Sequence, residues 1–134
     1  MNNILGGSFT SRINMNLRES KHWSYGAMTI MVETAAQRPF IVFAPVQTDK
    51  TKESMREVKL EFENILKNSP PTEAELAKVK KQQTLQLAGA WETIDSIAGS
   101  IRELIQYSLP EDYFEKYPGN VRALALPAIS RAAA

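Results

Sequence analysis

The sequence predicts an α+β fold in which one antiparallel β-hairpin, cut from a larger sheet, packs against several α-helices. Two runs rich in β-branched and aromatic residues, 25–32 and 40–46, flank a turn at Gln37-Arg38-Pro39 and indicate the hairpin. Apolar residues at helical spacing fill most of the remaining chain. Prolines, glycines and helix-capping residues divide that remainder into four or five helices.

The composition of the chain favours some classes of protein and excludes others. The chain has 134 residues, enough for one domain or less, and its 43% hydrophobic and 23% charged residues are typical of a globular protein. The net charge of +1 gives no indication of nucleic-acid binding. Cysteine is absent, which excludes disulfides and thiolate metal sites. No apolar run approaches the roughly 20 residues of a membrane-spanning helix, so we expect no membrane span.

The first helical stretch follows the glycine pair Gly6-Gly7, which ends any helix before it. We expect Ser8 or Thr10 to cap the new helix. Its apolar stripe recurs every four residues, at Phe9, Ile13 and Leu17. Arg18 lies on another face with Ser11 and Asn14, so the spacing predicts that it projects away from the core.

The hairpin follows a short polar loop. Tyr25 begins the first extended run, and Phe40 begins the second. Pro45 interrupts the second run and cannot donate to a strand ladder, so we expect it at an edge or a bulge.

Two helices should come next. The first begins near Thr51 and ends before Ser69-Pro70-Pro71, with an apolar stripe of Met55, Val58, Phe62, Ile65 and Leu66. The second begins with a capping box formed by Thr72 and Glu75. Its apolar residues are Leu76, Val79, Leu85 and Leu87.

The strongest helical stripe lies further along the chain and comprises Ile94, Ile97, Ala98, Ile101, Leu104 and Ile105. We expect this helix to contribute most to the core. A short helix should begin after Leu109-Pro110 and end at Pro118-Gly119. Residues 121–126 then form a connector, and Pro127 starts the last helix.

Several motifs together resemble one known family. The run Leu5-Gly6-Gly7, Ser11-Arg12-Ile13, Leu17-Arg18-Glu19 and, after a loop, Tyr25-Gly26-Ala27 is similar to the C-terminal half of pitrilysin/insulysin zinc metallopeptidases, which include the mitochondrial processing peptidases. Further similar runs are 46–51, 71–76, 91–93 and 109–113. The resemblance covers nearly the whole chain.

The resemblance implies a partial family domain over residues 1–134, truncated at both ends. Family domains carry further strands before this stretch and a closing strand after it. Because a lone hairpin is marginally stable, we expect the isolated fragment to self-associate. Similar bacterial proteins are often periplasmic, which makes the periplasm the expected compartment.

The resemblance also implies a divided active site. The family binds zinc through His-x-x-Glu-His, which is absent here; the chain has one histidine, His22, whereas a catalytic zinc needs three protein ligands. The zinc cofactor and general base are therefore expected in a zinc-bearing partner half, and this chain alone should be inactive, with no metal or cofactor ligands of its own. Arg18 and Tyr25 match the family pair that binds the peptide substrate and donates hydrogen bonds to the scissile carbonyl.

Other interpretations of these residues remain open. Arg18 could simply stabilise a helix end through the helix dipole, and Tyr25 could be a half-buried strand aromatic. His22 is interpreted as a loop residue. At the level of the protein, one alternative is a non-catalytic assembly or scaffold subunit of the same family, like the core proteins of a respiratory complex. Another is a peptide-binding module that takes a strand at the hairpin edge.

Overall fold

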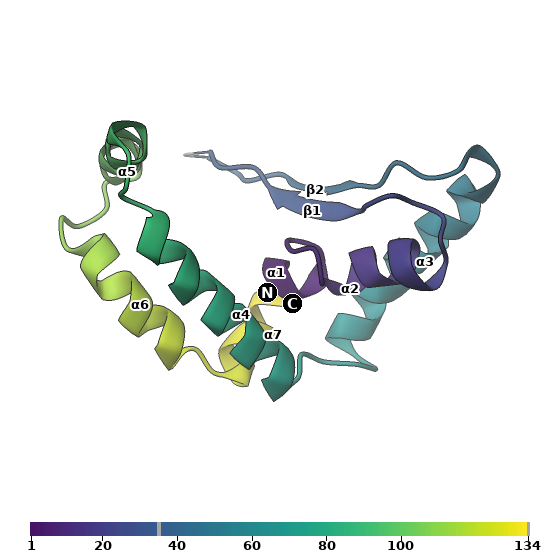
Figure 1. Ribbon diagram of the computed structural model, residues 1–134. Helices are drawn as coiled ribbons and strands as arrows, with labels where there is room; N and C mark the ends of the chain where they lie inside the picture. Colours follow the sequence, from purple (N-terminus) through teal and green to yellow (C-terminus); the bar gives the residue numbers. More distant parts are fainter. Residues whose placement is uncertain (35, 134) are drawn as a thin grey trace.

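The computed structural model describes residues 1–34 and 36–133. It confirms the α+β fold, with the helices gathered on one side of a two-stranded antiparallel hairpin (Figure 1). The elements in chain order are α1 Asn2–Leu5, α2 Arg12–Asn14, the π-helical η1 Met15–Ser20, β1 Met28–Met31, β2 Phe40–Phe43, the 3-10 turn η2 Thr48–Lys50, α3 Thr51–Leu66, α4 Glu73–Gln86, the 3-10 turn η3 Leu87–Gly89, α5 Ile94–Gln106, α6 Tyr113–Ala123 and α7 Leu126–Ala133.

The hairpin is antiparallel, as expected, and has an irregular base. Met28 lies opposite Phe43, and the ladder runs without interruption to the pair of Met31 and Phe40. Nearer the base, Ser24 bridges to Val46, so three residues of one strand oppose two of the other. This mismatch is a bulge, and Pro45 lies in it, as the sequence predicts.

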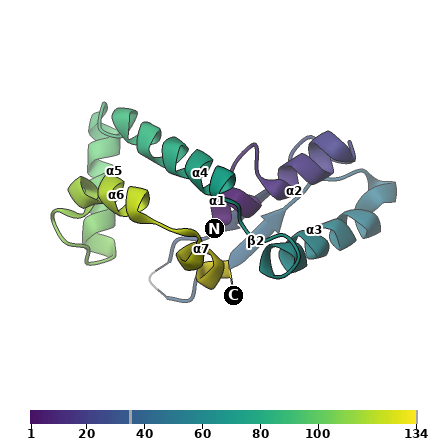
Figure 2. The same cartoon turned by 90° about the horizontal axis from the view of Figure 1, so that it is seen from below.

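The core lies beneath the hairpin, where the short N-terminal helices meet α3, α4 and α7. Figure 2 shows α1 near the centre of this arrangement, with α4, α3 and α7 around it. The buried apolar cluster comprises Ile4, Leu5, Ile13, Leu17, Ala27, Ile65, Leu76 and Ile129. The predicted stripe residues Ile13, Leu17, Ile65 and Leu76 therefore lie in the core.

Phe9 does not belong to this core, although the stripe predicted it there. Its side chain is 66% exposed, because the helix begins only at Arg12 and residues 8–11 form a turn before it. The expected cap is also wrong: the N-cap residue is Ser11, and its side chain makes no capping hydrogen bond. A residue that precedes the helix does not follow the helical spacing, and this explains both errors.

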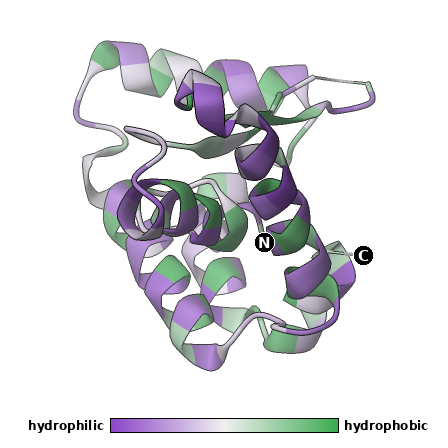
Figure 3. Ribbon diagram, turned by 90° about the vertical axis from the view of Figure 1, so that its right-hand side faces the viewer, coloured by the Kyte–Doolittle hydropathy of each residue, from purple (hydrophilic) through white to green (hydrophobic). Residues whose placement is uncertain are grey.

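The prediction that α5 contributes most to the core is wrong. The helix forms where the stripe predicts it, but none of its described residues is buried. Figure 1 shows why: α5 lies at the end of the molecule away from α1, α2 and α3. Figure 3 shows hydrophobic and hydrophilic bands alternating along the helices, which is typical of amphipathic helices whether or not a partner covers them. Met55, Leu66 and Leu85, also expected inside, are exposed.

The helix α6 continues through Pro118, where the sequence predicted a break. Proline removes the N–H that would bond to the carbonyl of Phe114. Packing outweighs that loss, because Val121, which the sequence placed in a connector, is buried, and the Tyr117 hydroxyl donates to Gln83 of α4 at 2.8 Å. The last helix begins at Leu126, next to Pro127, as predicted.

Two further observations concern membranes and metals. Within residues 1–34 and 36–133, the helices are too short or too polar to cross a bilayer. Within the same residues, no three His, Cys, Asp or Glu side chains gather where they could bind one metal ion.

Candidate functional site

Arg18 and Tyr25, the predicted site residues, line one open cleft of about 640 Å³. Its walls come from the end of η1, the loop that follows it, and the segment after β2. The cleft is lined by Arg18, Glu19, His22, Trp23, Ser24, Tyr25, Pro45, Val46 and Gln47. The fold thus places the two predicted residues on the same concave surface.

Arg18 lies in the last turn of η1, and its side chain is one-third exposed. Its guanidinium stacks over the ring of Phe9, with 4.3 Å between the ζ-carbon and the ring centroid. One nitrogen, Nη1, lies 3.4 Å from a carboxylate oxygen of Glu19, yet it is buried and makes no hydrogen bond to any described protein atom. Arg18 therefore has one buried guanidinium donor without a hydrogen-bond acceptor among the described residues.

Tyr25 is fully exposed in a bend between the Ser24 bridge and β1. Ser24 holds that bend, because its hydroxyl lies 2.7 Å from the carbonyl oxygen of Pro45 and accepts a hydrogen bond from the Gly26 amide at 3.1 Å. The amide of Gln47 also donates to the Trp23 carbonyl at 2.9 Å. The interpretation of Tyr25 as a half-buried strand aromatic is therefore wrong; its phenol is free to meet a ligand.

His22 lies two residues after the end of η1 and adopts a left-handed conformation, with φ of 57°. Its Nδ1 lies 3.1 Å from the carbonyl oxygen of Arg18, and as the N–H form it donates to that oxygen. The amide of Trp23 donates to the Leu17 carbonyl at 2.9 Å, so two carbonyls at the helix end find partners. His22 is thus a loop residue, as expected, and it fixes the backbone that carries Arg18.

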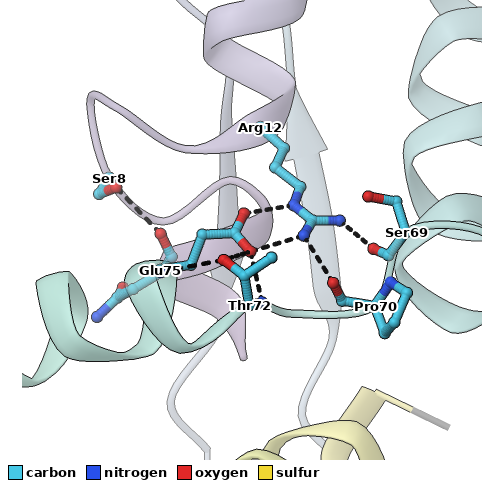
Figure 4. A network of polar contacts seen from close by, with 7 residues as sticks. Ser8, Arg12, Ser69, Pro70, Thr72 and Glu75 are labelled. Carbon is cyan, nitrogen blue, oxygen red and sulfur yellow. Dashed lines mark hydrogen bonds and ion pairs between the residues drawn. The ribbon is translucent and has the colours of Figure 1, made fainter.

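A polar network anchors the helix before the cleft to α4 (Figure 4). Arg12 donates from Nε and Nη2 to the two carboxylate oxygens of Glu75, each at 2.7 Å, and also donates to the carbonyls of Ser69 and Pro70. The Glu75 carboxylate accepts from the Thr72 amide at 2.8 Å, which completes the predicted capping box. The Arg12 hydrogen bonds lower the pKa of Glu75 from 4.5 to about 2. Sequence reasoning missed Arg12, because its partner lies 63 residues away.

Asn14 is the second residue that sequence reasoning missed. It is buried, donates to the Phe9 carbonyl, and accepts from the Ala27 amide at 2.9 Å. A buried amide joins the turn before the helix to the segment just after Tyr25. The available signal was a polar residue beside the apolar stripe, which the sequence alone could not distinguish from a solvated one.

The residues of this chain do not fit a zinc site. A catalytic zinc needs three protein ligands of the histidine, cysteine or carboxylate type, and within residues 1–34 and 36–133 no three such side chains gather at one place. The cleft can instead supply hydrogen-bond donors: the planar, permanently charged guanidinium of Arg18 and the phenol of Tyr25. Such donors stabilise an oxygen on which negative charge develops.

Comparison with known proteins identifies the family and the fold. Residues 1–83 match the family model described as the peptidase M16 inactive domain. No curated protein matches the chain. Among solved structures, the peptidase M16 inactive domain from Pseudomonas fluorescens shares 25% sequence identity at a TM-score of 0.87, with 98% of this chain and 31% of that chain covered.

Two further structures show the same fold at lower identity. A protease from Helicobacter pylori shares 20% identity at a TM-score of 0.81, with 98% of this chain and 32% of that chain covered. A protein described as a putative zinc protease from Bordetella pertussis Tohama I shares 16% identity at a TM-score of 0.79, with 98% and 71% covered.

The chain spans about a third of the length of the Pseudomonas and Helicobacter chains. The matched range 1–83 contains the cleft, the hairpin and the Arg12 network. The resemblance that the sequence motifs indicated is confirmed, and the chain belongs to the peptidase M16 inactive-domain family.

Proposed function

We propose that this chain is part of the zinc-free half of a zinc-dependent peptidase, in which Arg18 and Tyr25 bind the peptide backbone and stabilise the scissile carbonyl. The observation that carries the proposal is the shared cleft, where a buried Arg18 nitrogen has no hydrogen-bond partner among the described residues and the Tyr25 phenol is fully exposed. The family's inactive domains imply a catalytic partner half, and a zinc protease is among the names of the similar structures.

The chemistry follows from the charge that peptide hydrolysis creates. Attack on an amide carbon moves negative charge onto the carbonyl oxygen. A guanidinium and a phenol already aimed at that oxygen stabilise the transition state more than the ground state, because the ground-state carbonyl carries less charge. Arg18 suits this role because it stays charged at every working pH and its donors form a rigid fork. The zinc and the general base belong, in this proposal, to the other half.

The placement of the pair on a zinc-free domain has a mechanistic consequence. The two donors can reach the reacting carbonyl only when the halves close around the peptide. Substrate binding would therefore complete the site and exclude water at the same time.

The test measures peptidase activity of the complete enzyme, with the zinc-bearing half present, for the variants Arg18→Ala and Tyr25→Phe. Each should lower kcat by about 100- to 1,000-fold, since each removes one donor from the developing charge. Zinc content should match that of the wild type, because neither residue binds the metal. Unchanged kcat in both variants would contradict the proposal and leave a scaffold or peptide-binding role.

A second arginine–tyrosine contact provides a matched control. Arg38 stacks on Tyr107 at 5.4 Å, and neither residue lines the cleft. Arg38→Ala and Tyr107→Phe remove the same chemical groups elsewhere on the molecule. Both should leave kcat within about twofold of the wild type, because surface changes away from a site have small effects.

A further inference from the structure

Phe9 is the one large apolar residue of the predicted first stripe that the fold leaves outside. Its neighbours in the stripe, Ile13 and Leu17, are 0% and 1% exposed, whereas Phe9 is 66% exposed. An exposed phenylalanine needs no explanation by itself. What distinguishes Phe9 is its contact: the Arg18 guanidinium lies on its ring at 4.3 Å.

The position of Phe9 is fixed by its backbone. The buried Asn14 side chain donates to the Phe9 carbonyl, and the Ser11 amide donates to the Ser8 carbonyl at 3.1 Å. The same Asn14 side chain accepts from the Ala27 amide, two residues after Tyr25. The buried Asn14 side chain therefore holds two segments together: the one that carries the Phe9 ring and the one that carries Tyr25.

The stack limits the motion of a side chain that is otherwise very mobile. A free arginine side chain has about 2 kcal/mol of rotamer entropy at room temperature, and fixing it in advance spares that loss when substrate binds. Stacking uses only the flat face of the guanidinium, so the donors in its plane stay available. Nη1 lies in that plane and makes no hydrogen bond to the described residues.

We propose that Phe9 is a positioning residue: its exposed ring holds the Arg18 guanidinium flat, so that the donor edge meets the substrate carbonyl in the cleft. The inference rests on the proposed function of Arg18 and adds a residue that touches neither substrate nor metal. It also explains why an aromatic side chain stands in solvent at the start of this helix. The ring replaces, on one face, the water that would otherwise surround the guanidinium.

The test compares Phe9→Leu, which removes the π face and keeps apolar bulk, with Phe9→Tyr, which keeps the ring. In the complete peptidase, Phe9→Leu should lower kcat/KM about 3- to 30-fold, the range of a cation–π contact, and Phe9→Tyr should restore at least half of the wild-type value. Phe9→Leu added to Arg18→Ala should cause no further loss, because the ring then has nothing to position. Phe43→Leu, at another exposed phenylalanine on β2, is the control and should keep full activity.

A second measurement does not depend on activity. The proton NMR signal of the Arg18 Nε–H should be displaced upfield by the Phe9 ring current in the wild type and in Phe9→Tyr. Phe9→Leu should return that signal to the ordinary arginine range while the circular dichroism spectrum stays unchanged.

The outcomes separate the two proposals. A large loss in Arg18→Ala with wild-type activity in Phe9→Leu would overturn the positioning role and leave the proposed function standing. An equal loss from Phe9→Leu with and without Arg18 would also overturn it, since the ring would then act through something else. Full activity in Arg18→Ala would overturn both.

Discussion

The helical segment α2–η1 and the helix α5 carry similar apolar stripes but differ in what covers them. Ile13 and Leu17 in the first are completely buried, whereas Ile101 and Ile105 in the second are 51% and 75% exposed. The first lies beneath the hairpin, against α1 and α3, and the second lies at the far end of the molecule (Figure 1). The comparison teaches that helical spacing identifies the face that favours burial, while the neighbouring elements decide whether it is buried.

The side-chain hydrogen bonds around α2 and around α5 also differ in how far apart their partners lie in the sequence. Around α2, the Arg12–Glu75 pair and the Asn14 side chain connect distant parts of the chain. Around α5, the side-chain hydrogen bonds are more local: Thr93 with Ser96 at the start of the helix, and Trp91 with Ser100. The region that carries the candidate site is therefore joined by side-chain contacts to distant parts of the chain.

The largest expected difference in the free energy of unfolding is between a substitution in the core and one in the exposed stripe of α5. Leu5→Ala removes a completely buried side chain and should lower the free energy of unfolding by about 2–5 kcal/mol. Ile105→Ala removes an exposed one and should change it by less than about 0.5 kcal/mol. Urea unfolding followed by circular dichroism measures both. Similar decreases in the free energy of unfolding of the two variants would show that α5 is covered in solution. They would contradict the difference in burial between α2–η1 and α5.

Much of the local structure was predictable, because its causes lie within a few residues. The Thr72–Glu75 capping box, the hairpin and the bulge at Pro45 each follow from short-range rules about caps, turns and ladder hydrogen bonds. The site was predicted only as a pair of residues. That Arg18 and Tyr25 share a cleft depends on the folded path of the chain between them and on residues 45–47.

The features that sequence reasoning missed depend on distant partners or on rare geometry. The π-helical turn Met15–Ser20 shifts the end of the helix that carries Arg18, and no spacing rule predicts such a turn. The bond between Arg12 and Glu75 joins helices that are far apart in sequence. Phe9 illustrates a different limit, since its spacing was compatible with the core and only the helix start at Arg12 placed it in solvent.

The ion pair between Arg12 and Glu75 joins α2 to α4, and its contribution to stability can be measured. Glu75→Gln keeps the shape of the side chain but removes the charge that accepts two hydrogen bonds from Arg12. The free energy of unfolding at pH 7 should fall by about 1.5–3 kcal/mol, the usual range for a hydrogen bond to a charged group. Glu73→Gln, an exposed acid in the same first turn of α4, is the matched control and should have little effect.

The Arg12–Glu75 pair should also make the free energy of unfolding depend on pH in the acid range. The pKa of Glu75 is about 2 in the folded chain, against an ordinary value of 4.5, so the unfolded chain takes up the proton first as the pH falls. The contribution of the pair is therefore complete above about pH 4.5 and disappears as the pH falls towards 2. Wild type should lose more stability than Glu75→Gln across this window. Parallel curves for the two proteins would show that the pair contributes nothing.

The sequence-based expectation of self-association stays a prediction for this chain. Sedimentation at micromolar concentration tests it directly. A monomer with full helix content would contradict it, and a concentration-dependent oligomer would support it. The Leu5→Ala and Ile105→Ala measurements should be repeated at several protein concentrations, because association adds to apparent stability by mass action.

The smallest expected effect concerns the two capping boxes, which share one geometry in different surroundings. Thr72→Ala should lower the free energy of global unfolding by about 1 kcal/mol, because α4 packs on the core through Leu76. Thr93→Ala should weaken α5 by a similar amount but change global unfolding by less than about 0.5 kcal/mol, because α5 has no buried residue among those described and can open by itself. Amide hydrogen exchange distinguishes the cases: Thr93→Ala should speed exchange in residues 94–106 alone. Faster exchange in α1 and α2 as well would mean that α5 and the core unfold as one unit. The helices α4 and α5 would then differ in their exposure but not in their stability.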